Sequence, residues 1–423
     1  MNNMKITSGI DFGTSNSTVA FSDNGEVKNV RIENKNYSIP TALFFYADSN
    51  RKIFGNNAID AFLRHENGRL VQSIKTILGT SLMDEVVWIN NRHVYLISII
   101  EYFITHLKYR LDEQAGTPVD SVVVGRPVKF NVDDEVLDNQ AEDIMRNIAI
   151  KSGFRFVEFQ FEPVAAAFSH EQNIAGEKLA IVIDIGGGTS DFSVIKLGDQ
   201  LKNKTDRKDD ILANTGVKIG GNILDKNFCL SYFMPHLGRG TTLGSRNLPM
   251  PDHLYYELSD WNGINYIYNS RTNRLLKELY TEANDPVKVS RLVSLVTKKR
   301  AHELLGIVEQ TKIKLTLAES AQSILTAVHD KPSVTVNRSD FDNSSGKIFE
   351  MINCSLNECL VQAGKKSPDI DIVILTGGST EIIWLRETIQ KQFPNAFISD
   401  KNRFLSVCEG LVYDAMRKFS LST

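Results

Sequence analysis

The stretch IDIGGGTSD, residues 183–191, decides the fold, and a variant of it, GIDFGTSN, stands at residues 9–16. Each reads as a buried apolar strand, then an aspartate, then a turn of glycine, threonine and serine, then a second β-rich segment. Glycines leave room for backbone N–H groups to point at phosphate oxygens. The aspartate would repel a phosphate unless a divalent metal lay between them. Two such hairpins predict a nucleotide held from two sides.

The composition is that of an ordinary globular protein, with 42% hydrophobic and 23% charged residues in a chain of 423. This length suffices for about two to four structural units. The net charge of −3 shows no basic excess that would point to nucleic acid. No apolar stretch approaches the roughly 20 residues that span a bilayer, and residues 1–5 carry no apolar signal region. We therefore expect a cytoplasmic protein that binds neither nucleic acid nor membranes.

The cysteines give no sign of metal or redox chemistry. They form no CxxC pair, and no histidine stands at metal-ligand spacing from them. We expect buried, reduced thiols at Cys229, Cys354, Cys359 and Cys408.

The order of strands and helices restarts near residue 179, which predicts a duplicated α/β unit. We expect lobe I at residues 1–178 and lobe II at residues 179–423, with a divergent subdomain at 220–305. The polar stretch 202–210 is expected to be an exposed loop, and residues 234–270 carry no assignable pattern. Helices are expected at 56–63, 96–112, 134–152, 163–168, 287–317 and 406–419, and strands at 121–125, 156–161, 179–184 and 370–375.

Two further glycine motifs strengthen the phosphate hypothesis. Gly220 and Gly221 precede a predicted helix, and residues 377–379 (GGS) lie between a strand and a helix. Helix N-termini of this kind favour anions. Either hairpin alone would also fit an ordinary tight turn, so the set carries the argument. The chain contains neither GxxxxGK[ST] nor GxGxxG, which excludes the P-loop and the Rossmann fingerprint.

Taken together, these motifs resemble the actin/hexokinase/heat-shock ATPase superfamily, and most of all the nucleotide-binding domain of 70-kilodalton heat-shock (Hsp70/DnaK-like) chaperones. The resemblance implies an α/β, actin-like ATPase fold with two lobes of duplicated ribonuclease-H-like units around a nucleotide cleft. The matching motifs follow the family's order and span about residues 5–415. They are 9–17 and 184–191 (the phosphate hairpins), 73–79 (the catalytic-lysine segment), 162–167 (EPVAAA), 309–316 (the adenosine-contacting helix) and 377–380 (the adenosine loop).

The resemblance implies a set of catalytic residues. Lys75 would neutralise charge on the transferring phosphoryl group and help to place the water. Glu162 or Asp184 would orient that water, and Thr189 would contact it. Read without the family pattern, Lys75 would fit a surface lysine and Glu162 a first-turn helix acid. Phosphoryl transfer needs positioning and charge stabilisation more than a strong base, so this set would suffice.

The resemblance also implies a metal and a nucleotide. Asp11 and Asp184 would hold Mg²⁺, mainly through its waters, because Mg²⁺ dehydrates reluctantly. Asp191 would lie beside a monovalent cation such as K⁺. The residues implied for binding ATP or ADP are Gly13, Thr14, Ser15, Asn16, Gly186, Gly187, Gly188, Gly220, Gly221, Glu309, Lys312, Thr316, Gly377, Gly378 and Ser379.

The chain departs from the family pattern at the base and at the signalling segment. The family stacks two arginines on the adenine, and here those positions hold Ile313 and Glu381. An arginine plane offers stacking and charge that isoleucine lacks, so nucleotide selectivity is open. Pro127 matches the proline with which the family passes its ATP signal onward. The partner arginine does not match, because its aligned position lies close to Glu142 after an insertion near 132–138.

The chain ends directly after the last predicted helix, so we expect no peptide-binding domain, as in the short YegD-type branch of the family. The leading hypothesis is an Hsp70-like ATP-binding protein with slow Mg²⁺-dependent hydrolysis, which acts as a molecular chaperone or as a nucleotide-dependent switch without a substrate-binding domain. Its protein partners would be a co-chaperone or a nucleotide-exchange protein. A small-molecule, sugar-type kinase and an actin-like filament protein are the alternatives. A kinase would need a catalytic aspartate where the family pattern places Lys75 and Glu162.

Overall fold

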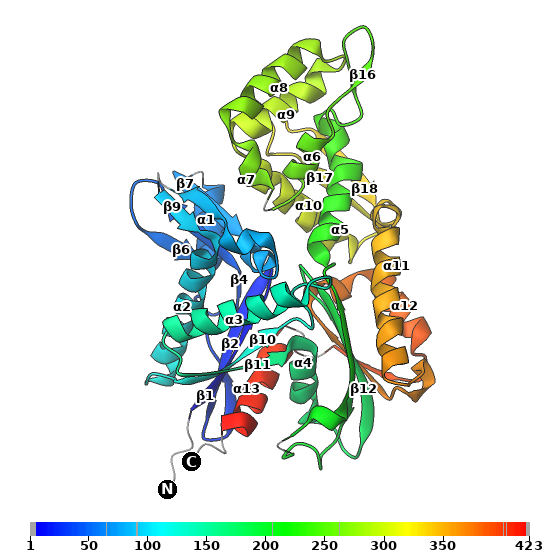
Figure 1. The fold of residues 1–423 in the computed structure, drawn as a ribbon. Coiled ribbons are helices and arrows are strands. Elements are labelled where there is room, and N and C mark those ends of the chain that lie inside the picture. Colours follow the sequence, from blue (N-terminus) through cyan, green and yellow to red (C-terminus); the bar gives the residue numbers. More distant parts are fainter. Residues whose placement is uncertain are drawn as a thin grey trace. The chain divides into compact units, whose positions relative to one another are not determined.

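The computed structural model describes residues 6–64, 66–89, 92–204, 206–261, 263–400, 402 and 404–419. The chain divides into two compact units (Figure 1). Unit 1 comprises residues 1–220, 352–380 and 385–423, and unit 2 comprises residues 221–351 and 381–384. The predicted lobe boundary at 178/179 stays a prediction, because this division follows compactness and falls after residue 220.

The two largest sheets of unit 1 are built on one plan. In the first, the order is β11-β10-β1-β2-β3, with β4 (Ser38–Pro40) also pairing with β2. Strand β1 pairs antiparallel with β2 and parallel with β10, and β10 pairs parallel with β11. The strands are β1 (Thr7–Phe12), β2 (Asn16–Asp23), β3 (Glu26–Asn29), β10 (Ser121–Arg126) and β11 (Phe156–Phe161).

The second sheet repeats this order and these directions as β20-β19-β12-β13-β14. Strand β12 pairs antiparallel with β13 and parallel with β19, and β19 pairs parallel with β20. The repeated plan confirms the predicted α/β duplication of the actin-like ATPase fold. The strands are β12 (Lys178–Ile185), β13 (Ser190–Leu197), β14 (Ile211–Val217), β19 (Ile372–Thr376) and β20 (Phe397–Ser399).

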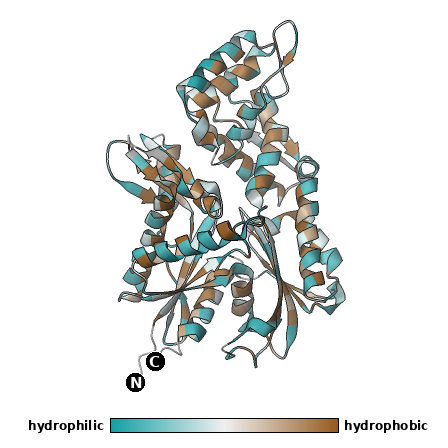
Figure 2. Cartoon of the chain, in the orientation of Figure 1, coloured by the Kyte–Doolittle hydropathy of each residue, from teal (hydrophilic) through white to brown (hydrophobic). Residues whose placement is uncertain are grey.

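Helices α4 (Glu162–Glu171) and α13 (Ser406–Phe419) pack against each other and join the two sheets through one apolar core. The core takes Val123 from β10, Val182 from β12 and Leu411 from α13. The helices approach so closely that a Cβ on Gly410 would lie 1.6 Å from the carbonyl oxygen of Ala165. Figure 2 shows hydrophobic stretches alternating with polar ones along the strands of unit 1, whereas much of α3 (Glu135–Lys151) is hydrophilic.

The remaining elements of unit 1 confirm the other predicted helices of its N-terminal part. Asp134 caps α3 by accepting hydrogen bonds from the backbone N–H groups of Val136 and Leu137, which explains where this helix begins. The elements are β5 (Ala42–Tyr46), β6 (Lys52–Phe54), α1 (Gly55–Leu63), β7 (Gly68–Gln72), β8 (Val86–Ile89), β9 (Arg92–Tyr95) and α2 (Leu96–Ala115).

Unit 2 is mainly helical, and the stretch that sequence could not assign contains short helices. Within the described residues no helix is long and apolar enough to cross a membrane. Helix α11 belongs to unit 2 up to residue 351 and to unit 1 from residue 352. The elements are α5 (Gly221–Phe228), β15 (Thr242–Leu243), β16 (Leu248–Pro249), α6 (His253–Leu258), α7 (Ile264–Ile267), α8 (Ser270–Glu282), α9 (Pro286–Thr297), α10 (Ala301–Leu315), β17 (Ser320–Ile324), β18 (Ser333–Asn337) and α11 (Arg338–Gln362). Helix α12 (Ile383–Gln392) belongs to unit 1 from residue 385 onward.

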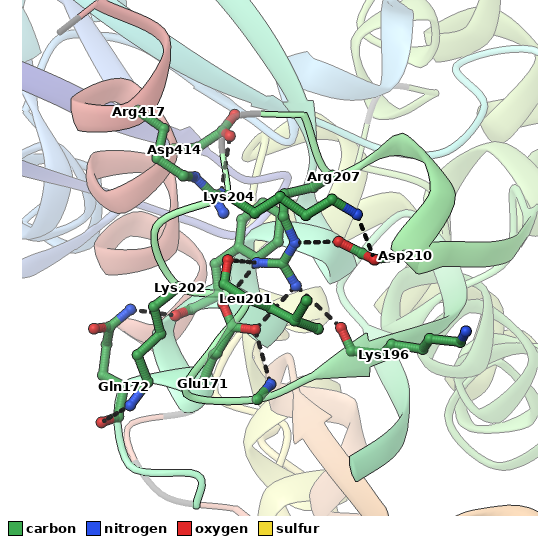
Figure 3. A network of polar contacts seen from close by, with 12 residues as sticks. Glu171, Gln172, Lys196, Leu201, Lys202, Lys204, Arg207, Asp210, Asp414 and Arg417 are labelled. Atoms are coloured by element: carbon green, nitrogen blue, oxygen red, sulfur yellow. Dashed lines mark hydrogen bonds and ion pairs between the residues drawn. The ribbon is translucent and has the colours of Figure 1, made fainter. Parts of the chain in front are cut away.

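Two expectations are wrong. Cys354 is exposed, although the other three cysteines are buried. The stretch 202–210 is not simply an exposed loop, because Arg207 and Asp210 are buried (Figure 3). The Arg207 guanidinium donates to Glu171 at 2.7 and 2.9 Å and to Asp210 at 2.7 Å. A charged segment looks solvated in sequence, but here it supplies the counter-ion for Glu171 at the end of α4.

We expect Arg207→Leu to lower the free energy of unfolding by about 3–5 kcal/mol, because it leaves the Glu171 carboxylate buried without its cation. Glu171 is only 1% exposed. Chemical denaturation with Arg155→Leu as control checks this, since the Arg155–Asp120 pair spans 3.7 Å at the surface and should matter by less than about 1 kcal/mol. Equal effects of the two substitutions would contradict a structural role for the Arg207 network.

Candidate functional site

Asp11 and Asp184 occupy equivalent places in the two largest sheets of unit 1. Each is the residue before the last of the central strand, β1 or β12, and each pairs across its hairpin, with Thr18 or with Asp191. Strand β12 also lies beside β19, where Asp184 pairs with Thr376. The duplicated topology therefore places a carboxylate at the tip of each hairpin.

The tips of the two hairpins meet within unit 1. A Cβ on Gly188 would lie 2.7 Å from Oγ1 of Thr14 and 3.4 Å from Cγ2 of Thr76. Only a residue without a side chain fits between these neighbours. Thr41 braces the first tip from behind, because its hydroxyl donates to the Gly13 carbonyl and its N–H donates to the Ser15 carbonyl, both at 2.8 Å.

Three other predicted residues pack around the second hairpin. A Cβ on Gly220 would lie 2.7 Å from the Gly186 carbonyl oxygen, and the Ser379 hydroxyl donates to that oxygen at 3.2 Å. Gly377 has a φ of +80° and a Cβ there would lie 2.4 Å from the Ile185 carbonyl oxygen, so both the conformation and the space require glycine. The glycine motifs that were separate in sequence thus form one cradle.

Lys75 and Glu162 form a buried ion pair beside this cradle. The Lys75 Nζ atom lies 2.5 Å from Oε1 of Glu162, and each side chain is 9% exposed. Lys75 lies on a short 3₁₀ turn, residues 74–77, that begins after Ser73 in the left-handed conformation, with a φ of +56°. Glu162 is the first residue of α4 and precedes Pro163, a residue favoured at that position. Lys75 is therefore not a solvated surface lysine, and Glu162 is a first-turn acid of α4 that is also the buried partner of Lys75.

Only one of the two carboxylate oxygens of Asp191 accepts a hydrogen bond from the described residues. The backbone N–H of Val128 donates to its Oδ1 atom at 2.8 Å, and a Cβ on Gly216 would lie 2.5 Å from the same oxygen. Its other oxygen, Oδ2, is buried and accepts no hydrogen bond from the described residues. A buried carboxylate oxygen without a partner is costly and calls for an additional donor or cation.

The site carries more buried negative than positive charge. Burial, aided by the nearby Glu162 carboxylate, raises the pKa of Asp11 to about 7. Burial and Glu162 also raise the pKa of Asp191 to about 7. The same causes hold the pKa of Asp184 well above its ordinary value. For Lys75, burial works against the charged form, but Glu162 and Asp11 raise its pKa overall. Four carboxylates thus share one lysine, and a cation would relieve their repulsion.

The residues fit a hydrated divalent cation better than a directly ligated one. Within the described ranges, no group of three or more histidine, cysteine, aspartate or glutamate side chains is arranged to hold a metal ion. Mg²⁺ usually keeps several waters and takes one or two carboxylates together with phosphate oxygens. Asp11 and Asp184 at the hairpin tips suit that arrangement, and the free Oδ2 atom of Asp191 could accept from a bound water or contact a monovalent cation.

Comparison with known proteins agrees with this geometry. Residues 89–233 match the family model described as MreB/Mbl protein, and residues 276–403 match the model described as Hsp70 protein. These matches support the predicted likeness to the Hsp70/actin-like ATPase superfamily. A curated relative, the chaperone protein DnaK of Mycoplasmopsis agalactiae, is 25% identical over 396 residues, which cover 91% of this chain and 54% of the relative. The chain therefore spans about half the length of this relative.

The residues predicted to contact the nucleoside in this Hsp70-like chain belong to unit 2, apart from those of the loop at 377–379. Glu309 and Lys312 lie on α10, Thr316 follows its last residue, and Gly221 opens α5. Lys312 pairs with Asp225 at 2.8 Å, and burial raises the pKa of Asp225 to about 6 although Lys312 opposes this. Their roles in nucleotide binding stay predictions.

The departures from the Hsp70 pattern are visible in the structure. Ile313 is 45% exposed on α10, so its side chain fills no core. Glu142, at the aligned place of the signalling arginine, pairs with Arg126, which immediately precedes Pro127. Sequence reasoning did not single out Arg126, Asp138 or Asp225. Each is a charged residue that the structure buries, and the signal available was only its position one to four residues from Pro127, Glu142 or Gly221.

Proposed function

We propose that this protein binds ATP and ADP with Mg²⁺ and slowly hydrolyses ATP as an Hsp70-like nucleotide switch. The observation that carries the proposal is the buried Lys75–Glu162 pair, at 2.5 Å, among the carboxylates beneath two glycine hairpins. Phosphoryl transfer depends on such positioning and charge stabilisation. The proposal that the protein hydrolyses ATP, and does not only bind it, rests on this site and on the likeness to the Hsp70 family.

The chemistry follows from where the residues lie. Mg²⁺ would supply charge neutralisation at the phosphates and would be held by Asp11 and Asp184 through its waters. Thr14, Ser15 and the backbone amides of residues 186–189 would hold the β- and γ-phosphates. Lys75 would stabilise the charge that develops as a water oxygen bonds to the γ-phosphorus and the bond to the β-phosphate oxygen breaks. Glu162 or Asp184 would orient that water, with Thr189 beside it. The water's protons leave with the inorganic phosphate and solvent.

A switch of this kind acts through partners. The matched relative is called a chaperone, and a co-chaperone or a nucleotide-exchange protein is the class of partner that we propose for this chain. Capture of partners from a lysate with ATP-loaded protein, compared with ADP-loaded protein, would identify them. Partners that bind equally in both states would argue against a nucleotide-dependent switch.

Isothermal titration with ATP and ADP tests the proposal, with and without Mg²⁺. We expect binding of both nucleotides that tightens with Mg²⁺, and slow release of phosphate from ATP. Absence of nucleotide binding in the presence of Mg²⁺ would refute the proposal. Binding without any phosphate release would reduce it to a nucleotide-binding protein.

An actin-like filament protein is the second candidate, because residues 89–233 match the MreB/Mbl model. Light scattering after addition of ATP and Mg²⁺ separates the two. A rise that depends on protein concentration would favour filaments, whereas steady scattering with continued hydrolysis would favour the switch.

We expect Ile313→Arg to raise ATP affinity about fivefold, since a guanidinium stacked on the base contributes about 1 kcal/mol. The exposure of Ile313, at 45%, leaves room for the longer side chain. Titration with ATP and with inorganic tripolyphosphate checks this, with Ile150→Arg as the matched control because Ile150 is 50% exposed on α3. An equal gain for tripolyphosphate would show charge attraction rather than stacking.

A further inference from the structure

The loop at residues 127–131 contacts both sides of the candidate site within unit 1. Its Val128 N–H donates to Oδ1 of Asp191 at 2.8 Å. Its Asn131 side-chain amide donates to the carbonyl of Gly79 at 2.7 Å, just after the turn that carries Lys75. A Cβ on Gly79 would lie 2.8 Å from the Phe130 backbone, so loop and turn are in close contact. Movement of this loop would therefore disturb Asp191 and Lys75 together.

Asp138 holds this loop in place. It lies in the first turn of α3 and is only 3% exposed. Its Oδ1 atom accepts from the backbone N–H groups of Phe130 at 2.5 Å and Asn131 at 3.2 Å. Its Oδ2 atom accepts from Nη2 of Arg126 at 2.8 Å. Buried charge-assisted hydrogen bonds of this kind are strong and directional.

Arg126 extends the same arrangement to Glu162. Its guanidinium lies 5.0 Å from the ring centroid of Phe130 and 5.5 Å from that of Phe161, the residue directly before Glu162. It also donates to the Pro127 carbonyl at 3.1 Å. The Arg126–Asp138 pair thus touches the segments that lead to three residues of the site: Lys75, Glu162 and Asp191.

We propose that Asp138 is a positioning residue for ATP hydrolysis, acting through the loop 127–131. The inference rests on the proposed function and goes beyond it, because Asp138 belongs to none of the matched motifs. A misplacement of about 1 Å at a reacting centre costs on the order of a hundredfold in rate. Nucleotide binding depends mainly on the hairpins, whereas the side-chain hydrogen bonds of Asp138 go to the loop and to Arg126. Loss of Asp138 should therefore affect turnover more than binding.

The test is the steady-state kinetics of Asp138→Asn. The asparagine keeps one oxygen for the loop N–H groups, but its amide N–H₂ then faces the Arg126 donors. We expect kcat to fall about tenfold or more, with KM for ATP and Kd for ADP within about threefold of the wild type. Hydrogen exchange at Val128 and in residues 74–79 should become faster. In the double variant Asp138→Asn/Arg126→Gln, the two neutral side-chain amides can hydrogen-bond to each other. We expect its kcat to be about threefold higher than that of Asp138→Asn alone.

Lys108→Met is the matched control, because Lys108 is another buried, ion-paired residue of unit 1, and its partner Asp112 also lies on helix α2. This variant should lose thermal stability without losing kcat. Asn131→Asp is a second test, at a partly exposed position. The aspartate keeps the Oδ1 atom that accepts from the N–H groups of Asp133 and Asp134. It replaces the side-chain amide that donates to the Gly79 carbonyl by a carboxylate oxygen, which cannot donate. It should lower kcat at unchanged KM.

Unchanged kcat in both Asp138→Asn and Asn131→Asp would overturn the inference. A rise in KM alone, or the same loss in Lys108→Met as in Asp138→Asn, would overturn it as well. These results differ from failure of the proposed function, in which the wild-type protein itself would show no nucleotide binding or no turnover.

Discussion

Lys75→Ala is expected to lower kcat by about 10²–10³-fold, the usual cost of removing one charge-stabilising group from a transition state. Lys75 is the basic side chain that pairs with the carboxylates of the candidate site, at 2.5 Å from Glu162. The loss should fall on kcat rather than on nucleotide affinity, because the hairpin amides and the Asp11–Asp184 pair do not depend on this ammonium for their placement. Single-turnover phosphate release, with Kd for ADP measured in parallel, checks that the rate falls while nucleotide affinity is retained.

Lys108→Ala serves as the control for Lys75→Ala, since Lys108 is also buried and ion-paired but lies on α2. It should leave kcat unchanged even if it lowers the melting temperature. The assignment of Lys75 would be contradicted if Lys75→Ala abolished ADP binding as fully as Asp11→Asn, because the two residues would then share one role.

Asp11→Asn is expected to abolish the tightening of nucleotide binding by Mg²⁺ while it stabilises the protein without metal. Burial raises the pKa of Asp11 to about 7, so ionisation of this carboxyl destabilises the folded state at neutral and higher pH. A shift of this size from the ordinary value corresponds to on the order of several kcal/mol. An uncharged amide removes that cost together with the charge that would hold Mg²⁺.

The stabilisation should depend on pH with a definite sign. Below the ordinary pKa of 3.8, Asp11 is protonated in both the folded and the unfolded chain and contributes nothing. Between that value and about 7 the unfolded chain ionises first, so wild-type stability falls as pH rises. Above about 7 both states are ionised and the deficit is constant. In EDTA at pH 8, Asp11→Asn should therefore melt higher by about 4 °C or more, and the gap should close toward pH 4.

Thermal melts across this pH range, with Asp143→Asn as control, test whether the stabilisation by Asp11→Asn depends on pH. Asp143 is an exposed carboxylate on α3. A gap between Asp11→Asn and wild type that stays constant with pH would show that titration of Asp11 is not its cause. Retained tightening by Mg²⁺ in Asp11→Asn would remove Asp11 from the proposed metal site.

Much of the fold could be predicted because its signals are local. The helix at 406–419, the strand at 121–125 and both hairpins follow from apolar periodicity and glycine turns, which depend on neighbouring residues. The exposed loop expected at 202–210 failed for the opposite reason. Arg207 is buried because Glu171, 36 residues away, needs a cation, and no local pattern encodes that pairing.

The same division applies to the site. Sequence alone determined its chemistry: two hairpins with an aspartate and glycines, a lysine, a glutamate before proline, and the altered base positions Ile313 and Glu381. Only the tertiary structure decided that Gly188 lies against Thr14, that Lys75 meets Glu162, and that Asp138 braces the loop on Asp191. Residue types and turns are properties of short segments, whereas burial, ion pairing and raised pKa values arise only when distant segments exclude water together.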